Sequence, residues 1–522
     1  MFTNIGLEWG INKCAAIHMK RGKLNTNNNN TNGMPVSNNC TIPVIGSDDH
    51  YKFLGKYQNT EHLEDKVIEE ASKEYEKRLW TVWTSPLSIP RKVRATNTYA
   101  VPVLQYYMWT TDWCLNHLKE LDRLTRKVIN DCSGKHKYES TPLLYLQPEQ
   151  GGKGLIELET LYKNTKLKVA NYINNSTDQN IKLVKSFQLE KEQRNLRSIF
   201  KDAKKYAEDL SIECSFNNNE TVLKINEKEV RTNSAEPQKV KNIIHIANVH
   251  KHKKDLQQQP WIGKFVNQHW NDPEISRSSY DLFKHWKNVP DVVLSVDTLI
   301  RQQLLNTRTY RKHKLQEHVE ELTCRICLEK QETATHILAN CSHLAQTLYS
   351  QRHDKMLRPI YHALLDKYGL EQSDYSSPWY KQSIPQPSEE NDEVKILWNI
   401  PWHLKKAPRN GSNKPDISVL DKKAKECILI EGTVCTPGTI PDRTKNKQEK
   451  YVDLRLGIKY LYPGFKVSQI NVVFDYLGAH HKELNKDLSK LFGTQVTNLT
   501  IERSQKWIIS QNCEIVKRFM CV

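Results

Sequence analysis

The sequence predicts a multidomain α+β protein, and three observations support this fold class. The chain has 522 residues, which is enough for about three domains at ~150 residues each. Apolar residues recur every four positions from Val67 to Trp83, which predicts one face of an amphipathic helix. Two short apolar runs, residues 417–420 and 427–430, flank a polar turn and predict a β-hairpin.

The composition is basic, with 77 Lys and Arg residues against 60 Asp and Glu residues, a net charge of +17 and a pI near 9.1. Such an excess favours a polyanionic partner, because neutralised phosphates release their counterions. No run of eighteen apolar residues is present, so we expect no membrane span. The first residues do not have the pattern of a signal peptide, so we do not expect secretion. The twelve cysteines are scattered apart from one cluster, which favours a reducing compartment over a disulfide scaffold.

The N-terminal part of the chain predicts short strands. Residues 5–24 predict a short helix and a strand, and the asparagine-rich residues 25–39 predict a solvated loop. Residues 51–55 alternate as a short strand.

Helical spacing follows the segment from Val67 to Trp83. A second helix is expected from Arg91 to about Tyr107, kinked at Pro102. A third is expected over residues 113–132. The glycines of residues 151–154 predict a plain turn, because the Gly-x4-Gly-Lys-Ser/Thr pattern of a phosphate loop is absent.

Residues 161–320 are polar and helical in composition, and predict a basic helical connector. Basic and aromatic residues interleave near its end, which suits phosphate contacts with some base stacking. The candidate nucleic-acid contacts are Arg301, Arg308, Tyr310, Arg311, Lys312 and Lys314. A solvated helix face explains the same residues equally well. Residues 374–392, rich in Ser, Pro and Glu, predict a linker.

One cysteine cluster has the spacing of a metal site, Cys-x2-Cys-x8-His-x4-Cys. Its candidate ligands are Cys324, Cys327, His336 and Cys341. Three thiolates and one imidazole are what tetrahedral Zn²⁺ needs, so we expect a closed, structural zinc site. His343 is an alternative ligand, but it lies too close to Cys341 in sequence to be preferred. A redox Cys-x-x-Cys pair is the other alternative, and it leaves the histidine and the third cysteine unexplained.

Two carboxylates bracket the predicted hairpin, since Asp416 begins its first strand and Glu431 ends its second. Pairing of the strands brings both to the same end. Two hard oxygen ligands suit Mg²⁺ or Mn²⁺, and such an ion activates water against a phosphodiester. A lysine-rich segment follows, and apolar residues continue after it at helical spacing (Val452, Leu456 and Tyr460). A helix there would place Lys447 or Lys450 over the same point. A charged surface hairpin explains the same two carboxylates without any chemistry.

Taken in order, these pieces resemble the C-terminal half of a non-LTR retrotransposon polyprotein, of the site-specific type with a restriction-like endonuclease. The N-terminal match consists of residues 2–15 for the last palm segment of the reverse transcriptase, residues 51–55 for its primer-grip hairpin, and residues 97–106, 121–127 and 144–155 for its thumb. The Cys-Cys-His-Cys knuckle with Tyr349-x2-Arg352-His353 after it resembles the linker module of that family. Lys-Pro-Asp at residues 414–416, then Glu431, resembles its endonuclease.

The resemblance implies six segments along the chain. They are a residual reverse transcriptase palm and primer-grip hairpin (1–60), a helical thumb (61–160), the basic helical connector (161–320), a zinc knuckle (321–360), a linker (361–392) and an α/β restriction-like, PD-(D/E)xK endonuclease core (393–522).

The resemblance further implies a metal-dependent endonuclease that nicks DNA at an insertion target. Asp416 and Glu431 would hold Mg²⁺ or Mn²⁺, and Lys447 or Lys450 would orient water or stabilise the phosphorane charge. The implied partners are target DNA and element RNA, and the implied location is the nucleus.

Two departures from the family pattern qualify this expectation. Nothing before Gly6 matches the Tyr/Phe-x-Asp-Asp motif that holds the polymerase metals, so we expect no autonomous DNA synthesis. A conventional restriction-type site has lysine two residues after the glutamate, where this chain has Thr433. The family takes its lysine from the following helix, which leaves Lys447 and Lys450 as candidates and Tyr451 as a weaker one.

The alternative hypothesis is a non-catalytic nucleic-acid-binding remnant of a decayed or repurposed element. Both hypotheses predict zinc and salt-sensitive DNA binding. They differ on whether the chain cleaves DNA.

Overall fold

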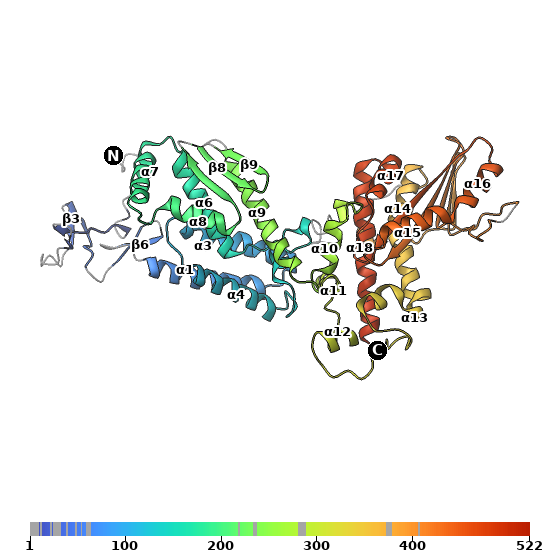
Figure 1. The fold of residues 1–522 in the computed structure, drawn as a ribbon, viewed down its shortest axis with the longest axis horizontal. Coiled ribbons are helices and arrows are strands. Elements are labelled where there is room, and N and C mark those ends of the chain that lie inside the picture. The colour runs from blue at the N-terminus through green and yellow to red at the C-terminus, as the bar shows by residue number, and fades with distance from the viewer. Residues whose placement is uncertain are drawn as a thin grey trace. The chain divides into compact units, whose positions relative to one another are not determined.

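The computed structural model is a mixed α+β protein, as the sequence predicts. It contains two compact units (Figure 1), where we expected about three domains. The first unit comprises residues 1–87, 94–132 and 156–248, and the second comprises residues 88–93, 133–155 and 249–522. The structure describes residues 10, 13–20, 23–24, 33–37, 40–46, 50–53, 55–58, 64–217, 220–232, 237–279, 289–371, 378–405 and 408–521.

The N-terminal part of the first unit contains three short antiparallel hairpins. Their strands are β1 (Met19–Lys20), β2 (Lys23–Leu24), β3 (Met34–Ser37), β4 (Cys40–Ile42), β5 (Tyr51–Phe53) and β6 (Lys56–Gln58). The strand expected at residues 51–55 is confirmed as β5. The turn after it contains Gly55, whose φ of 82° is a value that glycine adopts without strain. Most of residues 2–15, expected as a palm segment, lie outside the described residues.

Helices follow these hairpins, and all but the last of them lie where the apolar spacing predicts a helix. They are α1 (Glu64–Thr84), α2 (Ile89–Ala95), α3 (Val101–Met108), α4 (Leu115–Asp131) and α6 (Leu158–Asn175). Every fourth residue of α1 from Val67 to Trp83 is buried, as expected. The hydroxyl groups of Tyr75 in α1 and Thr125 in α4 are 2.7 Å apart. A π-helical turn, Thr96–Ala100, separates α2 from α3 just before Pro102, where we expected a kink.

The expectation of a purely helical connector over residues 161–320 is wrong. This segment contains α7 (Gln179–Gln193), α8 (Ile199–Asp209) and α9 (Pro237–Gln257), but also a three-stranded antiparallel sheet of β7 (Glu213–Asn217), β8 (Glu220–Ile225) and β9 (Lys228–Thr232). Burial alternates along β8, because Thr221, Leu223 and Ile225 face the core. A period of two residues is the signal of a strand. The segment is also divided between the two units.

The second unit begins with small helical elements. They are α5 (Thr141–Tyr145), α10 (Lys264–Asn271), α11 (Asp291–Arg301), α12 (Arg308–His313) and α13 (Ser342–Leu344). Residues 151–154 form a turn with positive φ at Gly151 and Gly154, as expected. Among the described residues, no helix combines the length and the apolar character that crossing a membrane requires.

A five-stranded mixed sheet forms the centre of the second unit. Its strands, in spatial order, are β10 (Ser388–Glu390), β11 (Val394–Trp398), β12 (Ile417–Asp421), β13 (Glu426–Cys435) and β14 (Lys466–Asp475). Neighbours are antiparallel except β13 and β14, which are parallel. The hairpin expected around residues 421–426 is confirmed as β12 and β13.

Helices cover both faces of this sheet. They are α14 (Ser350–Lys367), α15 (Ile440–Lys450), α16 (Val452–Leu461), α17 (Lys482–Phe492) and α18 (Thr494–Met520). On one face, α14, α17 and α18 bury the alternate apolar residues of β12 and β13, among them Ile417 and Ile430. On the other face, α16 packs Leu454 and Ile458 against Leu429. The helix expected after residue 450 is therefore present.

Two details of this unit differ from expectation. The apolar residues whose spacing predicted α16, Val452, Leu456 and Tyr460, are exposed, because the helix turns Leu454 and Ile458 inward instead. The linker expected over residues 361–392 is wrong at both ends, because the segment begins with the last turns of α14 and ends in β10 and the turn after it. The C-terminal turns of α14 are apolar enough to lie in the sheet core.

Candidate functional site

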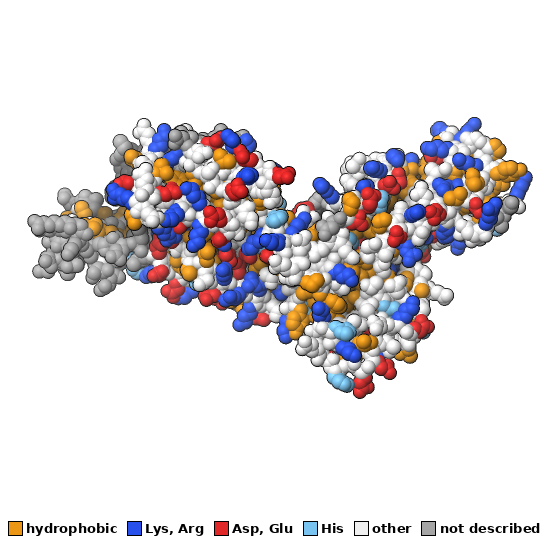
Figure 2. Space-filling model, in the orientation of Figure 1, with side chains coloured by type: hydrophobic (Ala, Val, Ile, Leu, Met, Phe, Trp, Pro, Cys, Tyr) orange, Lys and Arg blue, Asp and Glu red, His pale blue; other side chains and the backbone are white. Residues whose placement is uncertain are grey.

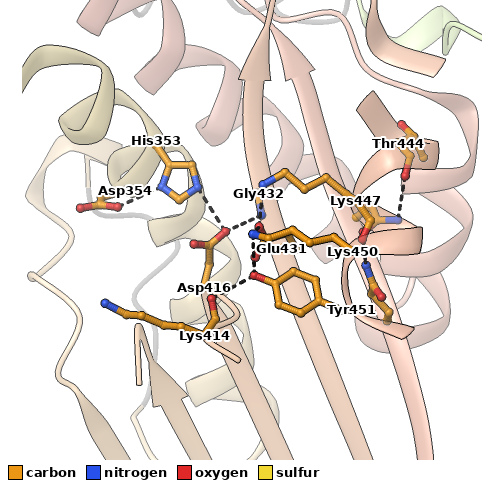
Figure 3. A network of polar contacts seen from close by, with 12 residues as sticks. His353, Asp354, Lys414, Asp416, Glu431, Gly432, Thr444, Lys447, Lys450 and Tyr451 are labelled. Atoms are coloured by element: carbon orange, nitrogen blue, oxygen red, sulfur yellow. Dashed lines mark hydrogen bonds and ion pairs between the residues drawn. The ribbon is translucent and has the colours of Figure 1, made fainter. Parts of the chain in front are cut away.

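The two candidate carboxylates lie where the pairing of β12 with β13 ends. Glu431 does not end its strand as predicted, because β13 continues to Cys435 along β14. Ile417 pairs with Ile430 in the β12–β13 register, so Asp416 and Glu431 are the next residues outward on adjacent strands. Figure 3 shows them close together, between α14 on one side and α15 on the other. Pairing of the strands is thus sufficient to bring these two residues together, as the sequence predicts.

One carboxylate oxygen of Asp416 makes contacts with two other residues. Its Oδ2 accepts a hydrogen bond of 2.7 Å from the backbone N–H of Gly432 and lies 3.2 Å from Nε2 of His353. Burial opposes ionisation of this carboxyl group, but the contact with His353, the Gly432 amide and the charge of Lys447 together hold its pKa below the usual range. Asp416 is therefore a carboxylate at neutral pH.

Glu431 is almost fully buried, with 3% of its side chain exposed. Its Oε1 accepts hydrogen bonds from Nζ of Lys447, at 2.5 Å, and from Nζ of Lys450, at 3.1 Å. Its Oε2 is buried and has no hydrogen-bond partner among the described residues. Leaving a buried carboxylate oxygen unpaired is costly, so this oxygen is suited to a ligand.

The two candidate lysines both lie in the last turn of α15, but their surroundings differ. Lys447 donates to Glu431, and its charge also lowers the pKa of Asp416. Lys450 donates to Glu431 and to the hydroxyl of Tyr451, at 2.9 Å. That hydroxyl in turn donates to the carbonyl of Lys414, at 3.0 Å. Burial and the charge of Glu431 raise the pKa of Tyr451, so its hydroxyl stays protonated.

His353 belongs to this site, and the sequence did not assign it a role. It lies in α14, where Nδ1 is 3.0 Å from Oδ1 of Asp354 and Nε2 faces Asp416. Burial lowers the pKa of this histidine, but the hydrogen bonds to the two carboxylates outweigh burial and raise the pKa to about 10. No motif reveals the contact, because α14 and β12 are far apart in the chain.

Gln469 and Asn471 of β14 were also not predicted. The side-chain amide of Gln469 donates to the carbonyl of Lys447, at 2.8 Å, and to Oδ1 of Asn471, at 2.7 Å. Asn471 donates to the carbonyl of Thr444, at 3.4 Å. These contacts attach the last two turns of α15 to β14, and they hold the backbone of Lys447 in place.

Asp416 and Glu431 are residues of the kind that could hold a hard divalent cation. Asp416 and Glu431 supply carboxylate oxygens, which are the ligands that Mg²⁺ and Mn²⁺ prefer. Oε2 of Glu431 is buried without a partner among the described residues. Such an ion usually keeps several waters and is bound by one or two carboxylates together with substrate phosphate oxygens, so a pair of carboxylates is an adequate protein contribution.

The predicted zinc ligands come together in the structure. Cys324, Cys327, His336 and Cys341 are all buried, and their ligand atoms lie within 4.8 Å of one another. Sγ of Cys327 lies 3.3 Å from Nε2 of His336. The group can hold a metal ion such as zinc. His343, the alternative ligand, is exposed.

Backbone contacts shape this cysteine cluster. The N–H of Leu328 donates to the carbonyl of Cys324, at 2.8 Å, and closes the Cys-x-x-Cys turn. The hydroxyl of Tyr349 donates to the carbonyl of Ile337, at 2.6 Å, and accepts from the N–H of Cys341, at 3.2 Å. Burial raises the pKa of Cys341 to about 12. Because a metal binds the thiolate, ion binding at this cluster would release protons.

The predicted nucleic-acid contacts are only partly accessible, and two of them are corrected. Arg301 is 7% exposed and binds Asp297 and the carbonyl of Leu477, and Tyr310 is also buried. Neither side chain is accessible to a nucleic acid, because each lies on the buried face of its helix, Arg301 on α11 and Tyr310 on α12.

The other four predicted contacts differ in exposure. Arg308 is partly buried and donates to the carbonyl of Thr323, at 3.0 Å. Arg311 pairs with Glu317, at 2.6 Å. Lys312 and Lys314 are exposed. Basic side chains are nevertheless widespread, since Figure 2 shows Lys and Arg spread among Asp and Glu over the face drawn.

No family model matches this chain, and no curated protein sequence matches it either. The geometry of the described residues is therefore what supports a function.

Proposed function

We propose that the chain is a metal-dependent DNA endonuclease, with its site at the end of the β12–β13 hairpin. One observation carries this proposal. Two carboxylates, the buried Glu431 and the partly buried Asp416, meet at one point with Lys447 beside both, and one oxygen of Glu431 has no partner among the described residues. Structural ion pairs also collect lysines and carboxylates, and they too can leave one buried oxygen unpaired among the described residues, as Oδ1 of Asp297 beside Arg301 shows. The convergence of both carboxylates and Lys447 at one point therefore carries the proposal.

The proposed division of labour follows from the contacts. Asp416 and Glu431 would hold Mg²⁺ or Mn²⁺, which when bound polarises a phosphoryl oxygen and lowers the pKa of a bound water. The Gly432 amide keeps Oδ2 of Asp416 in place. Lys447 brings a positive charge to the point where negative charge develops on the phosphate in the transition state.

Of the two candidate lysines, we propose Lys447 for the catalytic role. Its charge acts on both carboxylates, whereas Lys450 shares its ammonium group between Glu431 and the hydroxyl of Tyr451. Lys450 is thus suited to holding Tyr451 and Glu431 in position. Both lysines depend on the contact of α15 with Gln469.

The substrate and the setting complete the proposal. A net charge of +17 favours binding to the phosphates of target DNA and element RNA. The cysteine cluster would hold a structural Zn²⁺, since four protein ligands leave no open position for catalysis. We propose that the chain belongs to a non-LTR retrotransposon reverse transcriptase/endonuclease and acts in the nucleus.

Nicking of supercoiled plasmid with Mg²⁺ or Mn²⁺ tests this function. We expect wild type to nick, and Asp416→Ala and Glu431→Ala to lose nicking while keeping DNA affinity. Glu449→Ala is the matched control, because this exposed glutamate lies on α15 outside the carboxylate pair. A folded, zinc-loaded protein that binds DNA without nicking it would favour the non-catalytic remnant instead.

A further inference from the structure

The side chain of His353 connects α14 to the candidate metal site. Both of its ring nitrogens face carboxylate oxygens, Nδ1 that of Asp354 at 3.0 Å and Nε2 that of Asp416 at 3.2 Å. Asp354 lies on the same helix, so its contact fixes the rotation of the imidazole ring. A ring fixed in this way presents Nε2 to Asp416 from one direction only (Figure 3).

The helix that carries His353 is itself firmly placed. On α14, Leu357 lies one turn after His353, and helical residues four apart share a face. Leu357 packs directly on β13 at Gly432, where an added Cβ would lie 2.9 Å from Cδ1 of Leu357. A larger residue at this position would require the Leu357 side chain to shift. Gly432 is also the residue whose amide binds Asp416.

Two hydrogen bonds attach α14 to α18. The guanidinium group of Arg352 donates to Oδ1 of Asn512, at 2.8 Å, and the hydroxyl of Ser504 donates to the carbonyl of Met356, at 2.8 Å. Arg352 is almost fully buried. The residues on both sides of His353 are thus held, and the imidazole has little freedom to leave Asp416.

We propose that His353 is a positioning residue that orients the carboxylate of Asp416 for the divalent cation. Together with the Gly432 amide it engages Oδ2, which restricts rotation of the carboxylate and leaves Oδ1 for the cation. Groups that orient metal ligands in this way typically change metal affinity or activity about 10-fold to 100-fold when they are removed. The inference rests on the proposed endonuclease site, since it assigns Asp416 to the ion.

Binding of Mn²⁺ alone to the zinc-loaded full chain, measured by calorimetry, tests the inference without activity. We expect His353→Ala to weaken the Asp416-dependent Mn²⁺ site by about 10-fold or more. His353→Gln should restore most of the affinity, because the glutamine amide N–H can donate to Asp416 from about the same place as Nε2. His362→Gln is the matched control on the same helix, since His362 is buried and contacts Glu371 and the carbonyl of Ser383.

Nicking supplies a second readout. If His353 orients a ligand, His353→Ala should raise the Mn²⁺ concentration needed for half-maximal nicking, and excess Mn²⁺ should recover the rate. A loss of folding would instead reduce the rate at every concentration. If the alanine variant does not fold, His353→Gln is compared with wild type instead, after its thermal melting curve has shown that it is folded.

Three results would overturn the inference. They are wild-type Mn²⁺ affinity in folded His353→Ala, a folded His353→Gln that binds as weakly as Asp416→Ala, and wild-type affinity in Asp416→Ala. Failure of the proposed function looks different. Wild type would then bind Mn²⁺ through Asp416 without nicking DNA, and the effect of His353 on Mn²⁺ affinity would still decide the inference.

Discussion

A Cβ atom at Gly432 would lie 2.9 Å from Cδ1 of Leu357, so the side chain of Leu357 on α14 packs directly against the backbone of β13. Gly432 follows Glu431, and its amide binds Asp416. The contact of this leucine with this glycine therefore lies beside the end of the hairpin where both carboxylates lie.

Gly432→Ala should destabilise the second unit and move α14 away from the site. Inserting a methyl group into a packed core typically costs about 1–3 kcal/mol. We expect a lower urea midpoint and slower nicking. Adding Leu357→Ala removes the clash and should recover part of the lost nicking, and a double-mutant cycle measures the coupling. Additive effects of the two substitutions would contradict direct contact between these residues.

Lys447→Ala should reduce nicking by about 100-fold or more, the typical effect of losing a group that stabilises the transition state. Lys450→Ala should have a smaller effect, because its ammonium group is shared with Tyr451. Nicking rates of the two variants at saturating DNA measure this difference. Lys445→Ala, an exposed lysine of the same helix, controls for general loss of charge. Equal losses in the Lys447 and Lys450 variants would show that the assignment of roles is wrong.

Purified chain should contain about one zinc ion, measured by emission spectrometry, because the cysteine cluster offers one set of four ligands. Cys341→Ala should lose the ion and lower the melting temperature. Cys513→Ala removes a different buried thiol and should keep the zinc. Retention of zinc by the Cys341 variant would exclude that residue as a ligand.

The first unit should lose stability as the pH rises from about 4 to 7, through Asp122. Burial raises the pKa of this carboxyl group to about 7, although the amides of Leu158 and Glu159 donate to it and lower the pKa. The unfolded group has a pKa of about 3.9. The folded state therefore binds the proton more tightly, and its stabilisation is complete below pH ~4 and lost as the pH passes 7.

Asp122→Asn isolates this effect, because an amide resembles the protonated acid. The free energy of unfolding of wild type, relative to the variant, should fall by about 1.4 kcal/mol for each pH unit in that range. Urea denaturation of both proteins between pH 4 and 8 measures the difference, in which other titrating groups cancel. A difference that does not change with pH would show that Asp122 is ionised throughout.

Local patterns predicted much of the fold. The spacing from Val67 to Trp83 predicted α1 and its buried face, and the apolar runs around residues 421–426 predicted the β12–β13 hairpin. The ligand spacing of the cysteine cluster predicted a group that the structure brings together. Each of these signals depends on residues close to one another in sequence.

Other expectations failed where burial depends on distant segments. Composition predicted a helical connector, and the alternation around Leu223 that marks β8 is only six residues long. Arg301 has the charge of a phosphate contact, yet α11 turns it toward Asp297 and the carbonyl of Leu477. On α16, apolar spacing identified a helix but selected the exposed face.

The sequence by itself determined which residues are available for chemistry. Asp416 and Glu431 had to meet because strand pairing has a fixed register, and the cysteine ligands had to meet because short turns join them. The tertiary structure decided what surrounds them. His353 reaches Asp416, and Gln469 holds α15 at Lys447, only because α14 and β14 pack onto the same sheet. Contacts of this kind depend on the packing of whole elements, and no short stretch of sequence contains that information.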